Sequence, residues 1–163
     1  MSSFKTLRLI LGDQLNHNHS WYSTQDPSVL YVLAELHQET NYVRHHIQKI
    51  CGFFAAMAAF ADHLKANGHQ VLHLNLDETV EFSDLNGLIN HLTNKYSIGT
   101  FEYQQPDEYR LSQQLQLLDL DSEISVSCHD SEHFLLTNEE LKQYLNPKKH
   151  NRMESFYRKM RKR

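Results

Sequence analysis

Polar side chains follow three short apolar runs of this sequence, at the points where buried strands are expected to end. Carboxylates and carboxamides there offer hydrogen-bonding groups to a polar ring edge, and a glycine lets the backbone approach a ligand closely. In open parallel sheets, ligands bind beyond the carboxyl ends of the strands. The pattern therefore predicts a ligand site on one rim, with a plain turn as the alternative for Asp13. The candidates are Gly12, Asp13, Gln14 and Leu15 after the first run, Glu35 after the second, and Tyr103, Gln104, Gln105, Pro106, Asp107 and Tyr109 after the fourth.

A second group, Tyr42, His45 and Lys49, has the spacing of three and four that places side chains on one side of a helix. Such a stripe near the N-terminus of a helix can hold a polar or anionic ligand. An ordinary solvated helix face is the alternative. We expect these residues to complete the rim formed by the first group.

Twelve histidines invite a metal-site interpretation, but none of the closest pairs has a third ligand at a standard spacing. We therefore expect no metal. No phosphate loop and no dinucleotide-binding glycine motif is present. Asp13 and Glu35 are candidate neighbouring carboxylates without an evident reactive partner, so no catalytic residue is assigned. The histidine pairs considered are His17 with His19, His45 with His46, and His129 with His133.

Five apolar runs predict the strands of the scaffold that must position these residues. Four of the runs are rich in Val, Ile or Leu with little polar alternation, which is typical of strands buried on both faces. The runs are Leu7–Leu11, Val29–Ala34, Val71–Leu76, Gly99–Tyr103 and Ile124–Ser127.

Helical patterns lie between these runs. The longest spans about residues 41–67, where apolar residues from Val43 to Leu64 recur at steps of three and four. Further helices are expected over 84–96, over 106–118 and after Thr137, which can form a capping box with Glu140. Strands that alternate with helices need crossover connections. The prediction is therefore an α/β fold, a three-layer, Rossmann-like, five-stranded parallel sheet with helices on both faces.

The composition is that of one globular domain without a membrane span. The 163 residues are 40% hydrophobic and 22% charged, and no run of about 18 apolar residues occurs. The N-terminus lacks the pattern of a signal peptide. The two cysteines, Cys51 and Cys128, lie in apolar surroundings and are predicted to be buried reduced thiols. These features favour a cytoplasmic protein with no membrane partner.

Charge divides the sequence unevenly. Residues 148–163 hold eight of the 16 basic side chains and one of the 20 acidic ones, which leaves eight basic and 19 acidic in residues 1–147. The last residues show no helix stop signal. We therefore expect an α/β domain over 1–147, a basic amphipathic start of a linker or next domain over 148–163, and a chain cut at a domain boundary.

Three stretches resemble one protein family. They are LILGDQL at 9–15, VLAELHQETNYVRHHIQKICGFFAAMAAFADHL at 32–64 and MESFYRKMRKR at 153–163. Together they are similar to the amino-terminal part of the bacterial photolyase-related proteins, which include the iron–sulfur (6-4) photolyases and related cryptochromes. The resemblance covers essentially the whole sequence.

The resemblance implies an α/β antenna domain that binds a light-harvesting chromophore of ribityl-lumazine type. It implies that a helical domain, beyond residue 163, binds FAD, an iron–sulfur cluster and damaged DNA. That domain would be the partner of this one, and this sequence alone should be inactive as a photolyase. Two cysteines cannot supply four cluster ligands. The expected chromophore contacts are Gly12, Asp13, Gln14, Leu15, Glu35, Tyr42, His45 and Lys49.

Two functional classes stay open on the sequence. The first is the antenna domain of a DNA-repair photolyase or blue-light photoreceptor. The second is a stand-alone α/β ligand-binding or protein-interaction module without light chemistry. If part of the apolar stripe of residues 151–163 belongs to the boundary with the absent domain, we expect self-association of the fragment through this segment or disorder in it. The alternative is a helix that packs on its own domain.

Overall fold

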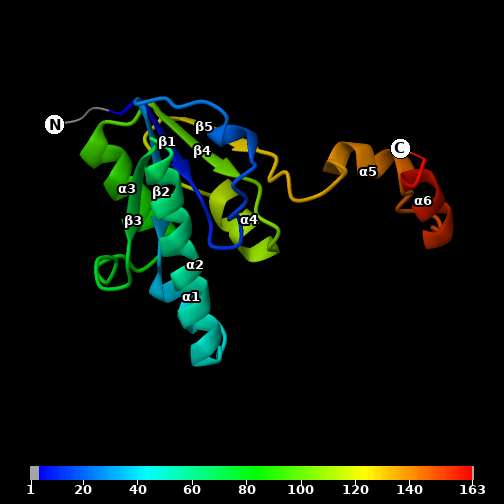
Figure 1. Cartoon of the computed structure of the whole chain (residues 1–163), viewed down its shortest axis with the longest axis horizontal. Helices are drawn as coiled ribbons and strands as arrows, with labels where there is room; N and C mark the ends of the chain where they lie inside the picture. Colours follow the sequence, from blue (N-terminus) through cyan, green and yellow to red (C-terminus); the bar gives the residue numbers. More distant parts are fainter. Residues whose placement is uncertain (1–3, 163) are drawn as a thin grey trace. The chain divides into compact units, whose positions relative to one another are not determined.

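The computed structural model describes residues 4–162 and divides into two compact units. The first unit reaches Ser131 and the second begins at Glu132. The sequence-based boundary at 147/148 therefore falls inside the second unit, between its two helices. Figure 1 shows the elements of both units along the chain.

The first unit is built on a five-stranded sheet whose neighbours all pair in parallel, in the order β3-β2-β1-β4-β5. This confirms the predicted α/β fold. Each expected apolar run contributes one strand, with bounds shifted by up to two residues. The strands are β1 (Thr6–Leu9), β2 (Val29–Ala34), β3 (Gln70–Leu74), β4 (Thr100–Gln104) and β5 (Ser125–His129).

Burial differs between the centre and the edges of this sheet. In β2, five of six residues are buried, as expected of a strand covered on both faces. In β5 no residue is buried, because this strand lies at an edge of the sheet.

The prediction that both cysteines are buried is wrong. Cys128 lies on β5 and Cys51 on the outer side of a helix, and both are exposed free thiols.

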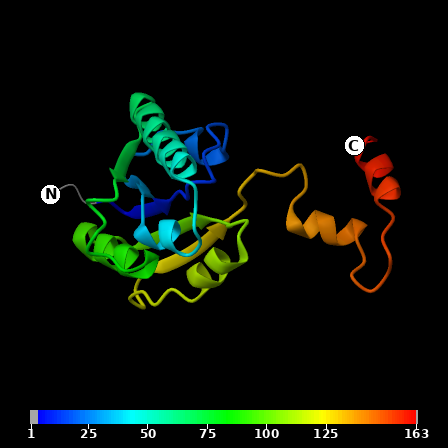
Figure 2. The same cartoon turned by 90° about the horizontal axis from the view of Figure 1, so that it is seen from below.

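Helices cover both faces of the sheet, as Figure 2 shows. On one face, α2 (Ile47–Ala66) packs through Met57, Phe60, Ala61 and Leu64. On the other face lie α3 (Leu85–Tyr96) and α4 (Tyr109–Gln116), which share a core with β1. A short 3-10 turn, η1 (Ser20–Tyr22), buries Trp21 beside α2 in the first of these cores. In the described range 4–162, no helix is both long and apolar enough to cross a membrane.

The region before α2 corrects the predicted helix of residues 41–67. A separate five-residue helix, α1 (His37–Asn41), ends at Tyr42, and α2 begins only at Ile47. His46 has extended backbone angles, and its Nδ1 accepts a hydrogen bond from Gln48 N at 3.2 Å. This imidazole cap defines the start of α2. The apolar spacing that began at Val43 therefore crosses a helix boundary.

The second unit contains α5 (Asn138–Tyr144) and α6 (Met153–Met160). The predicted capping box is confirmed, since the Thr137 side chain accepts from Glu140 N at 3.2 Å and Glu140 accepts in return from Thr137 N. Phe156 packs edge-on against Tyr144, with ring centroids 6.3 Å apart. Tyr157 stays 58% exposed, so only part of the apolar stripe of α6 is used inside this unit.

Candidate functional site

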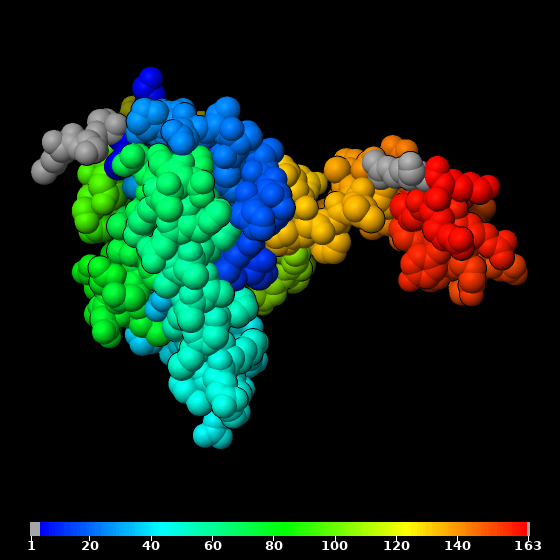
Figure 3. All heavy atoms as spheres, in the orientation of Figure 1, coloured from blue at the N-terminus to red at the C-terminus, as the bar shows by residue number. Residues whose placement is uncertain are grey.

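A cavity of about 180 Å³ lies at the carboxyl ends of β1 and β2, between this edge of the sheet and the first half of α2. Its interior is apolar and comes from both sheet and helix. Figure 3 shows the first turns of α2 in cyan, where they stand clear of the rest of the first unit. The apolar lining residues are Leu9, Ile10, Leu11, Ala34, Leu36, Ile50, Phe53, Phe54, Met57, Leu85 and Leu111. Such an interior suits the flat face of an aromatic ring.

Polar groups gather at the rim of this cavity. They are contributed by the segment after β1, by α1 and the turn that follows it, by the first turn of α2, and by the residue before α4. An apolar interior with a few polar groups at its edge is the usual construction of a small-molecule site. The polar lining residues are Asp13, Glu39, Thr40, Tyr42, His45, Lys49 and Glu108.

Gly12 shapes the cavity by letting α2 come close. A Cβ at this position would lie 2.6 Å from Cε1 of Phe53 and 3.0 Å from Sδ of Met57. Those distances are far below van der Waals contact, so any side chain here would displace the phenyl ring. The glycine is therefore required for packing of the cavity wall, in addition to its place in the lining.

The structure places Gln14 and Leu15 outside the cavity lining. Gln14 is 1% exposed, and its Nε2 donates to the carbonyls of Gln104 and Gln105 at 3.2 and 3.3 Å. Its Oε1 accepts from Leu11 N at 3.1 Å. The carboxamide thus joins the ends of β1 and β4 through hydrogen bonds to backbone groups of the protein. Leu15 packs against the core beneath α2.

Glu35 also lies outside the lining, despite directly following β2. Its Oε1 is 3.3 Å from Nε2 of His73, and its Oε2 accepts from Leu76 N at 3.2 Å. The backbone carbonyl of Glu35 accepts from the buried Thr79 hydroxyl. This carboxylate therefore fixes the segment after β3 against the end of β2.

Tyr42, His45 and Lys49 do line one side of the cavity, but not as a stripe on one helix. Tyr42 is the C-cap of α1, His45 lies between the helices, and only Lys49 belongs to α2. They still contact one another, since the centroids of the Tyr42 and His45 rings are 5.3 Å apart and Lys49 Nζ is 3.2 Å from Nδ1 of His45. Of the eight predicted site residues, the cavity brings together Gly12, Asp13, Tyr42, His45 and Lys49.

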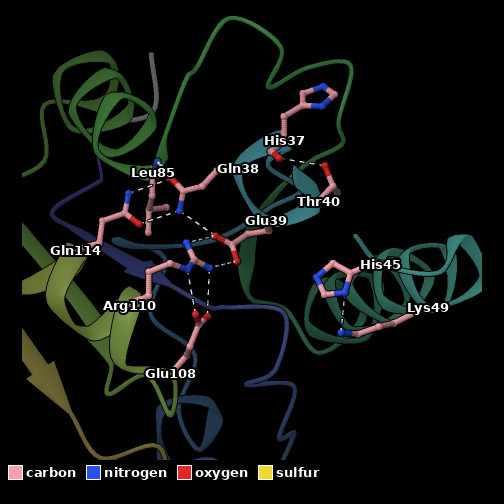
Figure 4. Close-up of polar contacts among 10 residues, drawn as sticks. All are labelled: His37, Gln38, Glu39, Thr40, His45, Lys49, Leu85, Glu108, Arg110 and Gln114. Carbon is pink, nitrogen blue, oxygen red and sulfur yellow. Dashed lines mark hydrogen bonds and ion pairs between the residues drawn. The ribbon is translucent and has the colours of Figure 1, made fainter. Parts of the chain in front are cut away.

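The opposite side of the rim was not anticipated from the sequence. Figure 4 shows Arg110 of α4 between the carboxylates of Glu39 and Glu108. Its NH2 donates to Glu39 Oε2 at 2.8 Å, and its Nε donates to Glu108 Oε1 at 2.9 Å. The guanidinium also lies over the Tyr42 ring, 4.3 Å from its centroid. An Arg two positions after a Glu on a short helix carries no sequence signal for such a contact.

Two amides fix α1 next to this ion pair. Gln38 and Gln114 exchange hydrogen bonds of 2.7 and 3.0 Å, and Gln38 Oε1 also accepts from Leu85 N at 3.2 Å. Desolvation would lower the pKa of Arg110, but its hydrogen bonds to Glu39 and Glu108 outweigh that effect and the pKa is raised. The guanidinium therefore stays charged at every pH at which the protein folds.

Within the described residues, no three His, Cys, Asp or Glu side chains are arranged to hold a metal ion. Ser127, His129 and Glu102 do approach one another, at 3.3 Å and 3.7 Å. Both distances involve Nε2 of the histidine, whereas a nucleophilic triad uses the two ring nitrogens for the two partners. This cluster therefore does not have the geometry of a triad.

Comparison with known proteins gives two findings. A family model described as deoxyribodipyrimidine photo-lyase-related protein matches residues 8–163. A protein of Agrobacterium fabrum named "(6-4) photolyase" is 29% identical over 156 residues. That match covers 95% of this chain and 31% of the relative.

Proposed function

Because this chain belongs to the deoxyribodipyrimidine photo-lyase-related protein family, we propose that its first unit binds a light-harvesting chromophore of ribityl-lumazine type. The observation that carries the proposal is the apolar cavity with a polar rim at the carboxyl edge of the sheet. Its construction matches a flat heterocycle that bears a hydroxylated chain. When bound, such a group would absorb light and pass the excitation on.

The residues present suit this group. Phenyl rings of α2 and aliphatic side chains at the end of β1 offer the surface that a heterocycle needs, namely Phe53, Phe54, Leu9, Ile10 and Leu11. Carboxylates accept hydrogen bonds from hydroxyl groups, and Asp13 is the one of the two predicted carboxylate contacts that lies in the cavity lining. Gln14 and Glu35 lie outside the cavity lining. In this proposal they support the strand ends and leave the contacts to the cavity residues.

The light-driven chemistry itself is proposed to belong to a partner. By the family resemblance, a helical domain with FAD and an iron–sulfur cluster would act on damaged DNA, and the present chain would serve it in DNA repair or light sensing. The chain spans 31% of the relative that it matches. Its two thiols lie on α2 and β5 and are too few for a four-cysteine cluster.

A fluorescence titration with a ribityl-lumazine tests the proposal. We expect saturable binding by the wild-type chain and roughly tenfold weaker binding by Asp13→Ala, because a hydrogen bond to a charged group is lost. Asp62→Ala is the matched control, since Asp62 is an exposed carboxylate of α2 outside the cavity. Absence of binding by the wild type would refute the proposal. Equal affinity of Asp13→Ala would remove Asp13 from the site.

A further inference from the structure

One wall of the cavity is a short connecting segment, residues 36–45, which lies between β2 and α2. Leu36 anchors its beginning in the core, but the helix α1 within it has five residues and none of them is buried. A helix of that length is too short to be stable on its own. Contacts with other elements must therefore hold this segment, called the α1 wall below. Its lining residues are Leu36, Glu39, Thr40, Tyr42 and His45.

Arg110 of α4 contacts the α1 wall at two points. Its guanidinium donates to both oxygens of Glu39, at 2.8 and 3.3 Å, and lies 4.3 Å from the centroid of the Tyr42 ring. Figure 4 shows Gln114, one turn further along α4, joined to Gln38 of the same wall. A two-point contact between an arginine and a carboxylate fixes orientation as well as distance. Arg110 therefore sets where this part of the wall lies.

The guanidinium of Arg110 is itself oriented from within its own element. Glu108, the residue before α4, accepts from it at 2.9 and 3.2 Å. Glu108 precedes Arg110 by two positions, whereas Glu39 lies 71 positions away. The Glu39 contact thus joins two elements, and the Glu108 contact supports it. Arg110 lies outside the cavity lining, so it would act on a ligand through the wall.

We propose that Arg110 is a positioning residue of the chromophore site, which keeps the α1 wall in place at the cavity through Glu39 and Tyr42. The inference rests on the chromophore-binding function proposed above and adds the residue that fixes one side of the site. A segment held by polar side-chain contacts can open locally while the core stays folded. Such a segment retains a bound ligand while it is closed. Loss of Arg110 should therefore speed dissociation of the ligand.

Trypsin cleavage after Arg44 measures opening of the α1 wall without a ligand. Arg44 is exposed in the turn between α1 and α2, and cleavage reports how often such a turn opens. We expect Arg110→Gln and Glu39→Gln to be cut about three- to fivefold faster than the wild type, the factor that a partly exposed ion pair contributes. Glu108→Gln leaves the wall contact in place and should change the rate less than about twofold. Mass spectrometry identifies the cut, and circular dichroism checks that each variant is folded.

A variant that combines Glu39→Gln with Arg110→Gln tests whether the two residues act together. If Arg110 holds the wall through Glu39, this double variant should be cut no faster than Arg110→Gln alone, because both substitutions remove the same contact. Increases in cleavage rate that multiply would show that the two residues act separately, and would overturn the inference.

Dissociation of a ribityl-lumazine, followed by stopped-flow fluorescence, measures the effect on the ligand. We expect Arg110→Gln to release it about three- to fivefold faster than the wild type, the same factor as for cleavage. Lys65→Gln is the matched control, because Lys65 pairs with Asp62 at 3.8 Å on α2, outside the cavity lining. It should leave the dissociation rate unchanged. This rate is a property of the folded complex, so a smaller folded fraction does not alter it.

The possible outcomes separate this inference from the proposed function. If Arg110→Gln is cut at the wild-type rate, other contacts hold the wall and the inference is refuted, whether or not the ligand binds. If it is cut faster but releases the ligand at the wild-type rate, the positioning role is refuted and chromophore binding stands. If the wild type binds no ribityl-lumazine, the proposed function fails and this inference fails with it, whatever the cleavage after Arg44 shows.

Discussion

The two ends of α2 have similar apolar character but opposite surroundings. Toward its C-terminus, Ala61 and Leu64 are at most 1% exposed and belong to the core on the sheet. Near its start, Ile47 is 65% exposed and Phe53 is 43% exposed. One end of the helix therefore stabilises the fold, and the other is left to line a cavity.

Helix and strand lengths explain this difference. A helix of 20 residues, such as α2, is about 30 Å long, whereas the six residues of β2 span about 20 Å. A helix anchored at its C-terminal end must therefore extend beyond the carboxyl edge of the sheet at its beginning. The same edge is where ligands of open parallel sheets bind.

Removing a large side chain from the buried end should have the largest effect on stability. Leu64→Ala should lower the free energy of unfolding by about 2–5 kcal/mol, because it leaves a cavity in the core. Ile47→Ala at the exposed start should change it by less than about 0.5 kcal/mol. Urea denaturation followed by circular dichroism measures both. Equal losses would mean that the beginning of α2 is part of the folded core.

The next largest effect on the free energy of unfolding is expected at Gly12, which lies in close contact with α2. Gly12→Ala should lower the free energy of unfolding by about 1–3 kcal/mol, because the new Cβ would lie 2.6 Å from Cε1 of Phe53 and the ring would be displaced. Gly52→Ala is the matched control on α2, where nothing lies within 4 Å of an added Cβ. There the better helix propensity of Ala should stabilise the protein by about 0.5–1 kcal/mol.

Combining Gly12→Ala with Phe53→Ala tests the cause of that loss. The second substitution removes the ring that the methyl group would strike, so the double variant should lose less than the sum of the two single losses. Additive losses would show that the strain at Gly12 lies elsewhere.

A smaller effect, on the pH dependence of stability, is expected from His69. This residue is buried next to the C-terminal end of α2 and contacts the rings of Tyr22 and Tyr31. Desolvation lowers the pKa of His69 in the folded state. As the pH falls below about 6.5, the unfolded chain therefore binds the proton first and the folded state loses stability.

Replacing this histidine should flatten the pH dependence. His69→Gln should decrease the drop in unfolding free energy between pH 7 and pH 5 relative to the wild type, measured by urea denaturation at each pH. The exposed His37 offers the control His37→Gln, which should leave the drop unchanged. An unchanged drop in His69→Gln would assign the acid sensitivity to other groups.

The smallest expected effect is weak self-association through α6. In this helix, as at the start of α2, apolar residues remain at the surface. Met153 is 46% exposed and Tyr157 is 58% exposed, while Phe156 packs on Tyr144. We predict weak self-association through this helix, driven by burial of those side chains. Analytical ultracentrifugation should detect a concentration-dependent increase in mass for the whole chain and none for a chain ending at Lys149. Strictly monomeric behaviour of both would favour packing within the second unit alone.

The sheet could be predicted from the sequence because its central strands are continuous apolar runs. The run Val29–Ala34 coincides with β2. The start of α2 could not be predicted, since apolar spacing continues from Val43 across the turn that separates it from α1. Histidine is not among the preferred N-cap residues, so His46 gave no signal as a cap.

The site was predictable only in part, for reasons of tertiary contact. Gly12, Asp13 and Lys49 line the cavity because the predicted strand ends and helix do meet there. Gln14 has the same sequence context as Asp13, yet its amide bonds to carbonyls 90 and 91 positions away. Arg110 fixes Glu39 across 71 positions. Pairings at such separations follow from the folded arrangement and leave no trace in local spacing.

The most direct test of the central claim, that the cavity at the carboxyl edge of the sheet binds the chromophore, is to map where the ligand binds. Backbone amide chemical shifts should be followed by NMR while a ribityl-lumazine is added to the whole chain. We expect the largest changes at residues 11–13 and 39–57, around the cavity, and small changes at the buried end of α2 from Phe60 to Leu64. The largest changes at residues 60–69 and 17–25, with none at 11–13, would contradict the assignment of the site to this cavity.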